Sequence, residues 1–259
     1  MIRRHLGASF RLIRQTDHAA LSGALAAALR EPLTNEAVLG ITLHDAGWSE
    51  HDDAPTLNND GEPRDVFEST LALGLPIWGA SAERAGEQHP YAGLLVSLHS
   101  LALAGHQLSA DTERRTQFDW LTLTTRMAEL QTQWREQLGM RVDRPTHHGL
   151  AAGWSDDRED TLRRDFRWLR AFDKISLDAC RTDVAFGTIE VGPDMVLRVE
   201  RPGDTDVKIG PWPFAEDALE FDVPYRAVPA RRYATAGELH EALVDAPTET
   251  MRFSFRPLR

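Results

Sequence analysis

The sequence predicts a mainly α-helical protein that ends in a smaller, sheet-rich segment. Apolar residues recur at helical spacing through most of residues 15–182. Beyond residue 183 the pattern changes to short runs in which apolar and polar residues alternate, as in strands. We therefore expect a helical domain over residues 1–182, which begins with a short strand or hairpin. Residues 183–259 should form a small α+β segment with an antiparallel sheet packed on that domain.

Residues that start and stop helices divide the helical domain. Pro32 and Gly47 follow helical runs, and Pro90 suits the first position of a helix. Expected helices cover about residues 17–30, 34–45, 66–78, 90–105, 111–138 and 155–180, and residues 10–14 precede them as a strand. Residues 49–66 are rich in Asp, Asn, Pro and Gly and form a loop of a length that is usually functional or disordered.

The C-terminal segment contains turn and cap signals between its alternating runs. Expected strands cover about residues 184–191, 195–199, 219–223 and 251–255. Residues 192–194, with the sequence Gly-Pro-Asp, suit a hairpin turn between the first two strands. Thr235 and Glu238 form the pattern of a capping box, which predicts one helix that ends before Pro247.

Composition favours a globular protein of the cytoplasm. The 259 residues are 42% hydrophobic and 27% charged, which is ordinary for such proteins. No apolar stretch approaches the roughly 20 residues that cross a bilayer, and no apolar signal-peptide core follows the first residues. Cys180 is the only cysteine, so an intramolecular disulfide is impossible. We therefore expect a cytoplasmic protein without a membrane partner.

The charge balance argues against nucleic acid as a ligand. The formal net charge is -11, whereas nucleic-acid binding depends largely on Lys and Arg side chains that neutralise phosphates. A small-molecule substrate is the expected partner. The sequence does not indicate the oligomeric state.

His44 and Asp45 are the most informative pair in the chain. They close the apolar run of residues 37–43 and are followed directly by the sequence Ala-Gly-Trp. A buried imidazole beside a carboxylate is costly unless both are paired, and a divalent metal ion is the simplest partner for both. The alternative is a histidine that the helix dipole favours at a C-terminus, beside an Asp that faces solvent.

His18 and Asp173 are further candidate ligands on separate helices. His18 lies in the first turn of the first long helix, where the alternative is an ordinary exposed histidine. Asp173 lies in an apolar part of the last long helix, where a carboxylate is usually paired. Its alternative is a surface contact with Arg170 or Lys174, and Asp178 is the second choice of carboxylate.

His99 and His89 compete for one further place in the site. His99 is surrounded by Leu and Val on its helix, which suits either a ligand or a satisfied core histidine. His89 immediately precedes Pro90 and is a further candidate for metal or substrate binding. We favour His99. If the site holds two metals, His99 or His89 would complete the second, and Asp45 would be the bridging carboxylate.

The ordered set His18, His44-Asp45, His99 and Asp173 resembles the HD-domain superfamily of metal enzymes over about residues 15–180. More narrowly, the sequences at 15–18, 44–48, 173–177 and 211–214 look like DUF3891, a bacterial family of uncharacterised function. The superfamily resemblance implies an HD-domain-like helical bundle whose ligands come from several helices. It also implies phosphohydrolase or phosphodiesterase activity in most members and di-iron oxygenase activity in a minority.

Three functions follow as hypotheses. The first is hydrolysis of a small phosphoric ester by a metal-activated water, the second is a di-iron oxygenase acting on a small polar substrate, and the third is a non-catalytic metal-binding protein. One or two divalent transition-metal ions are expected, and His and Asp ligands do not distinguish Fe, Mn, Zn, Co and Ni. Many phosphate-acting members carry a Lys shortly after the His-Asp pair, where this chain has Gly47 and Trp48, and this weakens the first hypothesis.

Three residues are candidates for substrate binding. Arg64 is the only cation in the loop of residues 49–65, and is the natural partner of an anionic substrate group. Trp48 could form the wall of a pocket for a partly apolar substrate, and Lys174 adjoins Asp173 in the chain. The alternative for the loop is a solvated insertion. No catalytic residue other than the ligands is indicated.

Overall fold

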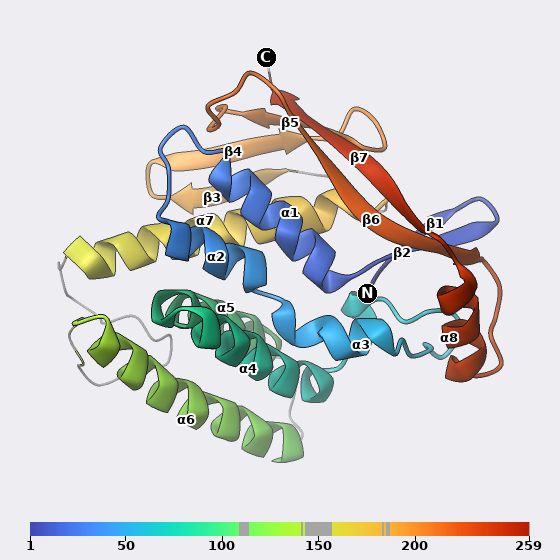
Figure 1. Ribbon diagram of the computed structural model, residues 1–259, viewed down its shortest axis with the longest axis horizontal. Coiled ribbons are helices and arrows are strands. Elements are labelled where there is room, and N and C mark those ends of the chain that lie inside the picture. Colours follow the sequence, from blue (N-terminus) through green and yellow to red (C-terminus); the bar gives the residue numbers. More distant parts are fainter. Residues whose placement is uncertain (109–113, 141, 143–156, 183, 185–186, 259) are drawn as a thin grey trace.

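A group of helices packs against one curved, seven-stranded sheet (Figure 1). This computed structural model describes residues 1–108, 114–140, 142, 157–182, 184 and 187–258. Helices α1 and α7 lie next to the sheet, and α2, α4, α5 and α6 lie on the far side of them (Figure 1). The candidate ligands therefore come from the middle of the molecule, between the sheet and the outer helices.

The described helices correspond closely to the expected ones. They are α1 (Gln15–Ala27), α2 (Asn35–Leu43), α3 (Ser49–Asp53), α4 (Leu71–Gln88), α5 (Pro90–Leu108), α6 (Arg114–Gln137), α7 (Asp157–Ala179) and α8 (Ala236–Asp245), with short 3₁₀ helices η1 (Ala46–Trp48) and η2 (Val66–Glu68). The main difference is α4, which begins later than expected and continues well past Pro76. No described helix is both long enough and apolar enough to span a membrane.

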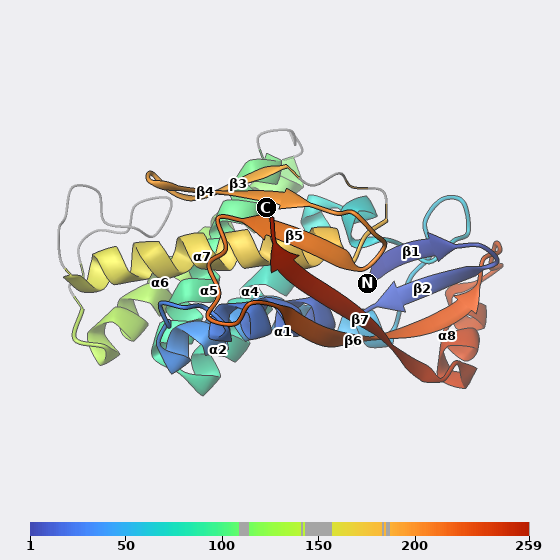
Figure 2. The same cartoon turned by 90° about the horizontal axis from the view of Figure 1, so that it is seen from above.

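The sheet combines strands from both ends of the chain. Its strands are β1 (Ile2–Leu6), β2 (Ser9–Ile13), β3 (Thr188–Gly192), β4 (Met195–Glu200), β5 (Asp206–Gly210), β6 (Leu219–Pro229) and β7 (Thr248–Pro257). Their order is β1-β2-β6-β7-β5-β4-β3. β5 runs parallel to β7, and the other neighbours are antiparallel. Figure 2 shows the sheet curving from β3 and β4, near α7, to β1 and β2, near α8.

This architecture corrects the predicted fold class. The prediction of a mainly α, HD-domain-like bundle with a small antiparallel tail was wrong, because the sheet is large and mixed. The N-terminal hairpin belongs to that sheet, since β2 pairs with β6 and Phe10 lies opposite Val228. Pairing between such distant segments leaves no local pattern in the sequence. The fold is therefore α+β, with the helices on one sheet built from both ends of the chain.

The sheet holds α7 from the side and from its C-terminal end. Phe172 of α7 stacks between Trp168, with ring centroids 5.0 Å apart, and Phe214 of the sheet segment, at 6.0 Å. At the end of α7, Arg4 of β1 and Arg201 donate hydrogen bonds to the Ala179 carbonyl, at 3.0 and 2.9 Å. Side-chain donors of this kind satisfy carbonyls that a helix C-terminus leaves unpaired. The position of α7 is thus fixed by residues far away in the sequence.

Cys180, just after α7, provides a test of this packing. It is fully buried, and burial raises the pKa of its thiol to about 12, although Arg4 and Arg201 act in the opposite direction. Because the thiolate is the reactive form, we expect the native protein not to react with the thiol reagent DTNB. Reaction should begin only with the unfolding transition measured by circular dichroism in urea. Stoichiometric labelling within minutes in native buffer would contradict this packing.

Candidate metal centre

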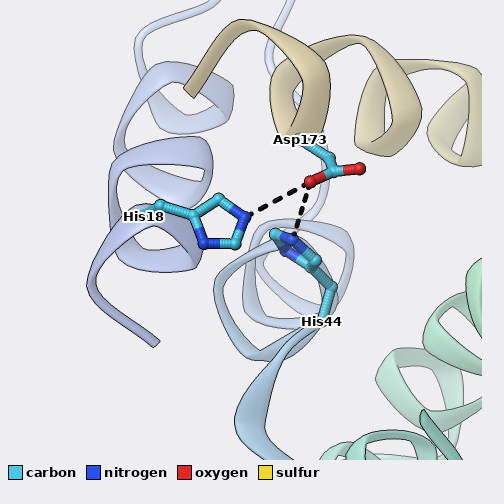
Figure 3. Close-up of side chains that lie close together, drawn as sticks. All are labelled: His18, His44 and Asp173. Atoms are coloured by element: carbon cyan, nitrogen blue, oxygen red, sulfur yellow. Dashed lines mark hydrogen bonds and ion pairs between the residues drawn. The ribbon is translucent and has the colours of Figure 1, made fainter. Parts of the chain in front are cut away.

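Imidazoles from two helices point at one carboxylate oxygen of a third (Figure 3). His18 comes from α1, His44 from the end of α2, and Asp173 from α7. The Nε2 atoms of His18 and His44 each lie 3.3 Å from Asp173 Oδ1. These three residues offer ligand atoms that all lie within 4.8 Å of one another, so the group could hold a metal ion.

Asp45 and His99 extend this group on two sides. Asp45 Oδ2 lies 3.7 Å from His18 Nε2 and 3.9 Å from His44 Nε2. His99 of α5 approaches the other oxygen of Asp173, with 3.6 Å between its Nε2 atom and Oδ2. Asp173 therefore faces His18 and His44 with one oxygen and His99 with the other. The structure brings together all five residues that the sequence indicated as ligands, and their ligation stays a prediction.

The backbone leaves the helix between His44 and Asp45, which lets both side chains reach the centre. His44 has φ −59° and ψ −24°, still helical, whereas Asp45 has φ −115° and ψ 22°. Gly47 allows the following turn to pack on α4, because a Cβ atom there would lie 2.1 Å from the Ile77 carbonyl oxygen. Its N–H donates to Ser81 Oγ at 2.9 Å. The two neighbours thus converge although adjacent helical residues point about 100° apart.

A buried hydroxyl pair fixes the distance between α1 and α7. Ser22 Oγ lies 2.7 Å from Ser176 Oγ, and its hydroxyl also lies 3.2 Å from the Phe172 carbonyl oxygen. Ser22 is one turn after His18, and Ser176 is one turn after Asp173. The sequence analysis missed this pair. Ser22 lies four residues after His18 and Ser176 lies three residues after Asp173, so each serine shares a helix face with a candidate ligand. This spacing is the signal that could have identified the pair.

The distances suit ligands around a cation better than hydrogen bonds between side chains. Metal–ligand bonds of about 2.0–2.2 Å place neighbouring ligand atoms roughly 3–3.6 Å apart. Among the described residues, the buried nitrogens without a hydrogen-bond partner include His44 Nε2 and both ring nitrogens of His99. Buried polar atoms are rarely left unpaired, because their desolvation is then uncompensated. The donor set therefore fits a transition-metal ion.

The tautomer of His44 also suits metal binding. Its Nδ1 atom lies 2.7 Å from the carbonyl oxygen of Ile41, which can only accept a hydrogen bond. In the neutral ring we therefore assign the proton to Nδ1, which leaves a lone pair for a metal ion on Nε2, the atom that faces Asp173. Histidine ligands are commonly oriented in this way by a bond from their second nitrogen.

Electrostatic interactions in the centre are strong and coupled. Burial opposes ionisation of Asp173, but its contacts with the imidazoles of His18 and His44 outweigh it and hold its pKa well below the usual value. Burial also opposes protonation of His44, yet Asp45 and Asp173 raise its pKa to about 9. Burial raises the pKa of Asp45 despite the two nearby imidazoles. Without a cation the carboxylates thus retain a proton on His44, and a divalent ion would take over its role.

The two carboxylates are the least buried side chains of the centre. The side chains of His18 and His44 are 0% exposed and that of His99 is 3% exposed, whereas Asp45 is 9% and Asp173 16% exposed. The carboxylate side is therefore the side of the centre that lies nearest to solvent. The three imidazoles form the inner wall.

Comparison with known families gives one match. A family model described as a protein of unknown function, DUF3891, matches residues 1–230. The chain belongs to this family. No curated protein and no solved structure matches it. The matched region includes all five residues of the centre and six of the seven strands that the structure describes.

Two other candidates of this DUF3891 chain lie elsewhere. At a rise of about 1.5 Å per residue, His89 and His99 are roughly 15 Å apart along α5, and His89 Nδ1 instead accepts a hydrogen bond from the Tyr91 N–H. The guanidinium of Arg64 bonds to acceptors near it in its own loop, on Thr56, Leu57 and Glu68. Neither residue is brought to the centre by any recorded contact.

Trp48 and Lys174 adjoin the candidate ligands in sequence but have other neighbours. Trp48 is buried and lies beside His51, with ring centroids 6.0 Å apart. Lys174 Nζ lies 2.7 Å from Asp178 Oδ2, one turn along α7. The loop after Asp45 is also more ordered than expected, since it contains α3, η2 and a bridge between Leu57 and Pro63. Roles in substrate binding for these residues stay predictions.

Replacement of His44 should abolish tight metal binding. We expect His44→Ala to raise the dissociation constant by about 100-fold or more, since changing even outer-shell partners costs 10–100-fold. Metal content after gel filtration, measured by plasma mass spectrometry, checks this. His89→Ala, at the residue between α4 and α5, is the matched control and should bind like the wild type. Equal metal content in both variants would contradict the assigned centre.

His99→Ala tests whether the third imidazole is a ligand. If His99 is a metal ligand, it either helps to hold a second ion near Asp173 Oδ2 or strengthens binding of the first ion. We therefore expect His99→Ala to bind fewer ions per chain or to bind its ion about tenfold more weakly. Isothermal titration calorimetry on the metal-free protein measures both quantities, and circular dichroism confirms the fold. Unchanged stoichiometry and affinity would make His99 a buried core histidine.

Proposed function

We propose that this protein is a metal-dependent hydrolase of small phosphoric esters. The observation that carries the proposal is the buried group of His18, His44 and Asp173, whose ligand atoms lie within 4.8 Å of one another. One of these atoms, His44 Nε2, has no hydrogen-bond partner among the described residues. The side chain of Asp173 is 16% exposed, so the carboxylate side of the group lies nearest to solvent. A centre that binds a substrate and a water molecule needs such a side.

The bound cation would supply the chemistry that the side chains lack. A divalent ion lowers the pKa of a bound water and polarises a phosphoryl oxygen. Imidazole and carboxylate ligands suit Mn, Fe, Co, Ni or Zn. The donor set is therefore compatible with each of these metals.

The protein side chains have separate tasks in this proposal. His18, His44 and His99 hold and enclose the centre, because their rings exclude solvent from its inner side. Asp173 supplies negative charge to the cation, and its depressed pKa means that it stays ionised without one. Asp45 lies at the solvent edge, 3.7 Å from His18, where it can orient an entering water by accepting its hydrogen bond.

A di-iron oxygenase is the second candidate, and one observation favours it. Asp173 faces His18 and His44 with Oδ1 and His99 with Oδ2, the arrangement expected of a carboxylate that bridges two ions. This geometry favours Asp173, rather than Asp45, as the bridging residue. The two functions share the donor set and differ in metal and substrate, so metal analysis separates them.

Metal loading followed by two assays tests the proposal. Metal-free protein is reconstituted separately with Mn, Fe, Co, Ni or Zn and assayed with p-nitrophenyl phosphate and bis(p-nitrophenyl) phosphate. We expect phosphate release with at least one metal and none in His44→Ala, with His89→Ala as the active control. Two ions of iron per chain with O₂-dependent spectral change and no ester hydrolysis would replace the hydrolase with the oxygenase. Failure of the wild type to bind any of the five metals would overturn both.

A further inference from the structure

Arg170 lies beside the solvent-facing side of the centre. It is one turn before Asp173 on α7, about 4.5 Å along the axis, and residues three apart are neighbours on a helix surface. Its side chain is exposed, and Asp173 is the most exposed of the five candidate ligands. An exposed cation therefore adjoins the least buried ligand of the centre on the surface of α7.

The guanidinium of Arg170 stacks on an aromatic ring of its own helix. Its Cζ atom lies 6.0 Å from the centroid of Phe166, one turn further towards the start of α7, where helical side chains tend to lean. Phe166, Arg170 and Asp173 are spaced by four and three residues, so they lie along one face of α7. Arg170 therefore shares a helix face with the central carboxylate.

Unlike Arg164 and Lys174, Arg170 has no carboxylate partner among the described residues, and its guanidinium stacks on Phe166. Arg164 of the same helix bonds to Asp165, and Lys174 bonds to Asp178. Arg64 has three acceptors in its own loop. The donors of Arg170 are therefore available to a ligand.

A guanidinium next to a cation site is repelled by the bound ion unless an anion lies between them. A phosphoryl group has oxygens for both, because one can bind the ion while two others accept parallel hydrogen bonds from the guanidinium. A phosphate monoester carries close to two negative charges and three terminal oxygens at neutral pH. A diester has one negative charge and two terminal oxygens. It therefore cannot bind the ion with one terminal oxygen and still offer two others to the guanidinium.

We propose that Arg170 binds the terminal phosphate of the substrate and makes this centre selective for phosphate monoesters over diesters. The proposal rests on the proposed function, since it needs the cation held by His18, His44 and Asp173. It assigns the anion-binding role to Arg170 rather than to Arg64. Arg170 is a binding residue for the transferred group and takes no part in holding the metal.

Phosphate binding to the metal-loaded protein tests this assignment without an activity measurement. Inorganic phosphate is titrated calorimetrically into protein loaded with Mn or Co, and metal content is measured in each sample. We expect Arg170→Gln to weaken phosphate binding by about tenfold or more, as for loss of a charge-assisted bidentate pair. Arg170→Lys should retain part of the affinity, because the charge remains but the fork is lost. Metal content should not change in either variant.

Arg167→Gln is the matched control. Arg167 is also exposed on α7, but its guanidinium lies towards Gly192 of β3, and the substitution removes the same charge. Equal phosphate affinity in Arg167→Gln and Arg170→Gln would overturn the proposal and leave metal binding intact. Normal metal loading without measurable phosphate binding in the wild type would also overturn it. Failure of the wild type to load metal would overturn the proposed function as well, so the two failures are distinguishable.

The selectivity has its own readout. The ratio of kcat/KM for p-nitrophenyl phosphate to that for bis(p-nitrophenyl) phosphate should fall about tenfold in Arg170→Gln and stay unchanged in Arg167→Gln. An equal loss with both substrates would show that Arg170 does not distinguish monoesters from diesters, which would overturn the selectivity part.

Discussion

The carboxylate of Asp173, buried among three imidazoles, is the interaction on which the middle of this structure depends. His18, His44 and His99 come from three different elements, and each has a ring nitrogen within 3.6 Å of one of its oxygens. Such a charge is tolerable inside a protein only when its partners are held in place, because a misplaced partner leaves it unpaired. The hydroxyl pair of Ser22 and Ser176 and the aromatic stack on Phe172 keep α1 and α7 at the required separation.

The sheet contributes to the centre indirectly, through α7. Arg4 comes from the first strand of the chain and Arg201 from beyond β4, yet both donate to the last turn of α7. Phe214, also from the sheet segment, packs against the turn of α7 that carries Asp173. Loss of either end of the chain would therefore loosen the helix that supplies the central carboxylate. This explains physically why the sheet and the helices form one structure rather than a bundle with an appended tail.

Much of the candidate site and several strands could be predicted from the sequence, whereas the pairing of the strands into one large sheet could not. His44 and Asp173 stand out because polar, ionisable residues interrupt apolar helical runs, and this signal is local. The pairing of β2 with β6 and the parallel pairing of β5 with β7 join segments with no local signal of their partner, so the fold class was wrong. The sequence also could not show how the side chains of His44 and Asp45 both reach the centre, because this depends on a change of backbone conformation at Asp45 after α2 ends.

Charged residues were harder to interpret than the ligands, because the role of a cation depends on which acceptors the fold brings to it. Arg64 was prominent in the sequence as the one cation of a polar loop, but the loop folds back so that its own acceptors surround the guanidinium. Arg170 was treated only as a surface partner for Asp173. In the structure Asp173 contacts the imidazoles instead, and Arg170 is exposed and stacks on Phe166. The contacts that build the centre thus use the carboxylate that the sequence offered to Arg170, and this cation is the one that we assign to the substrate.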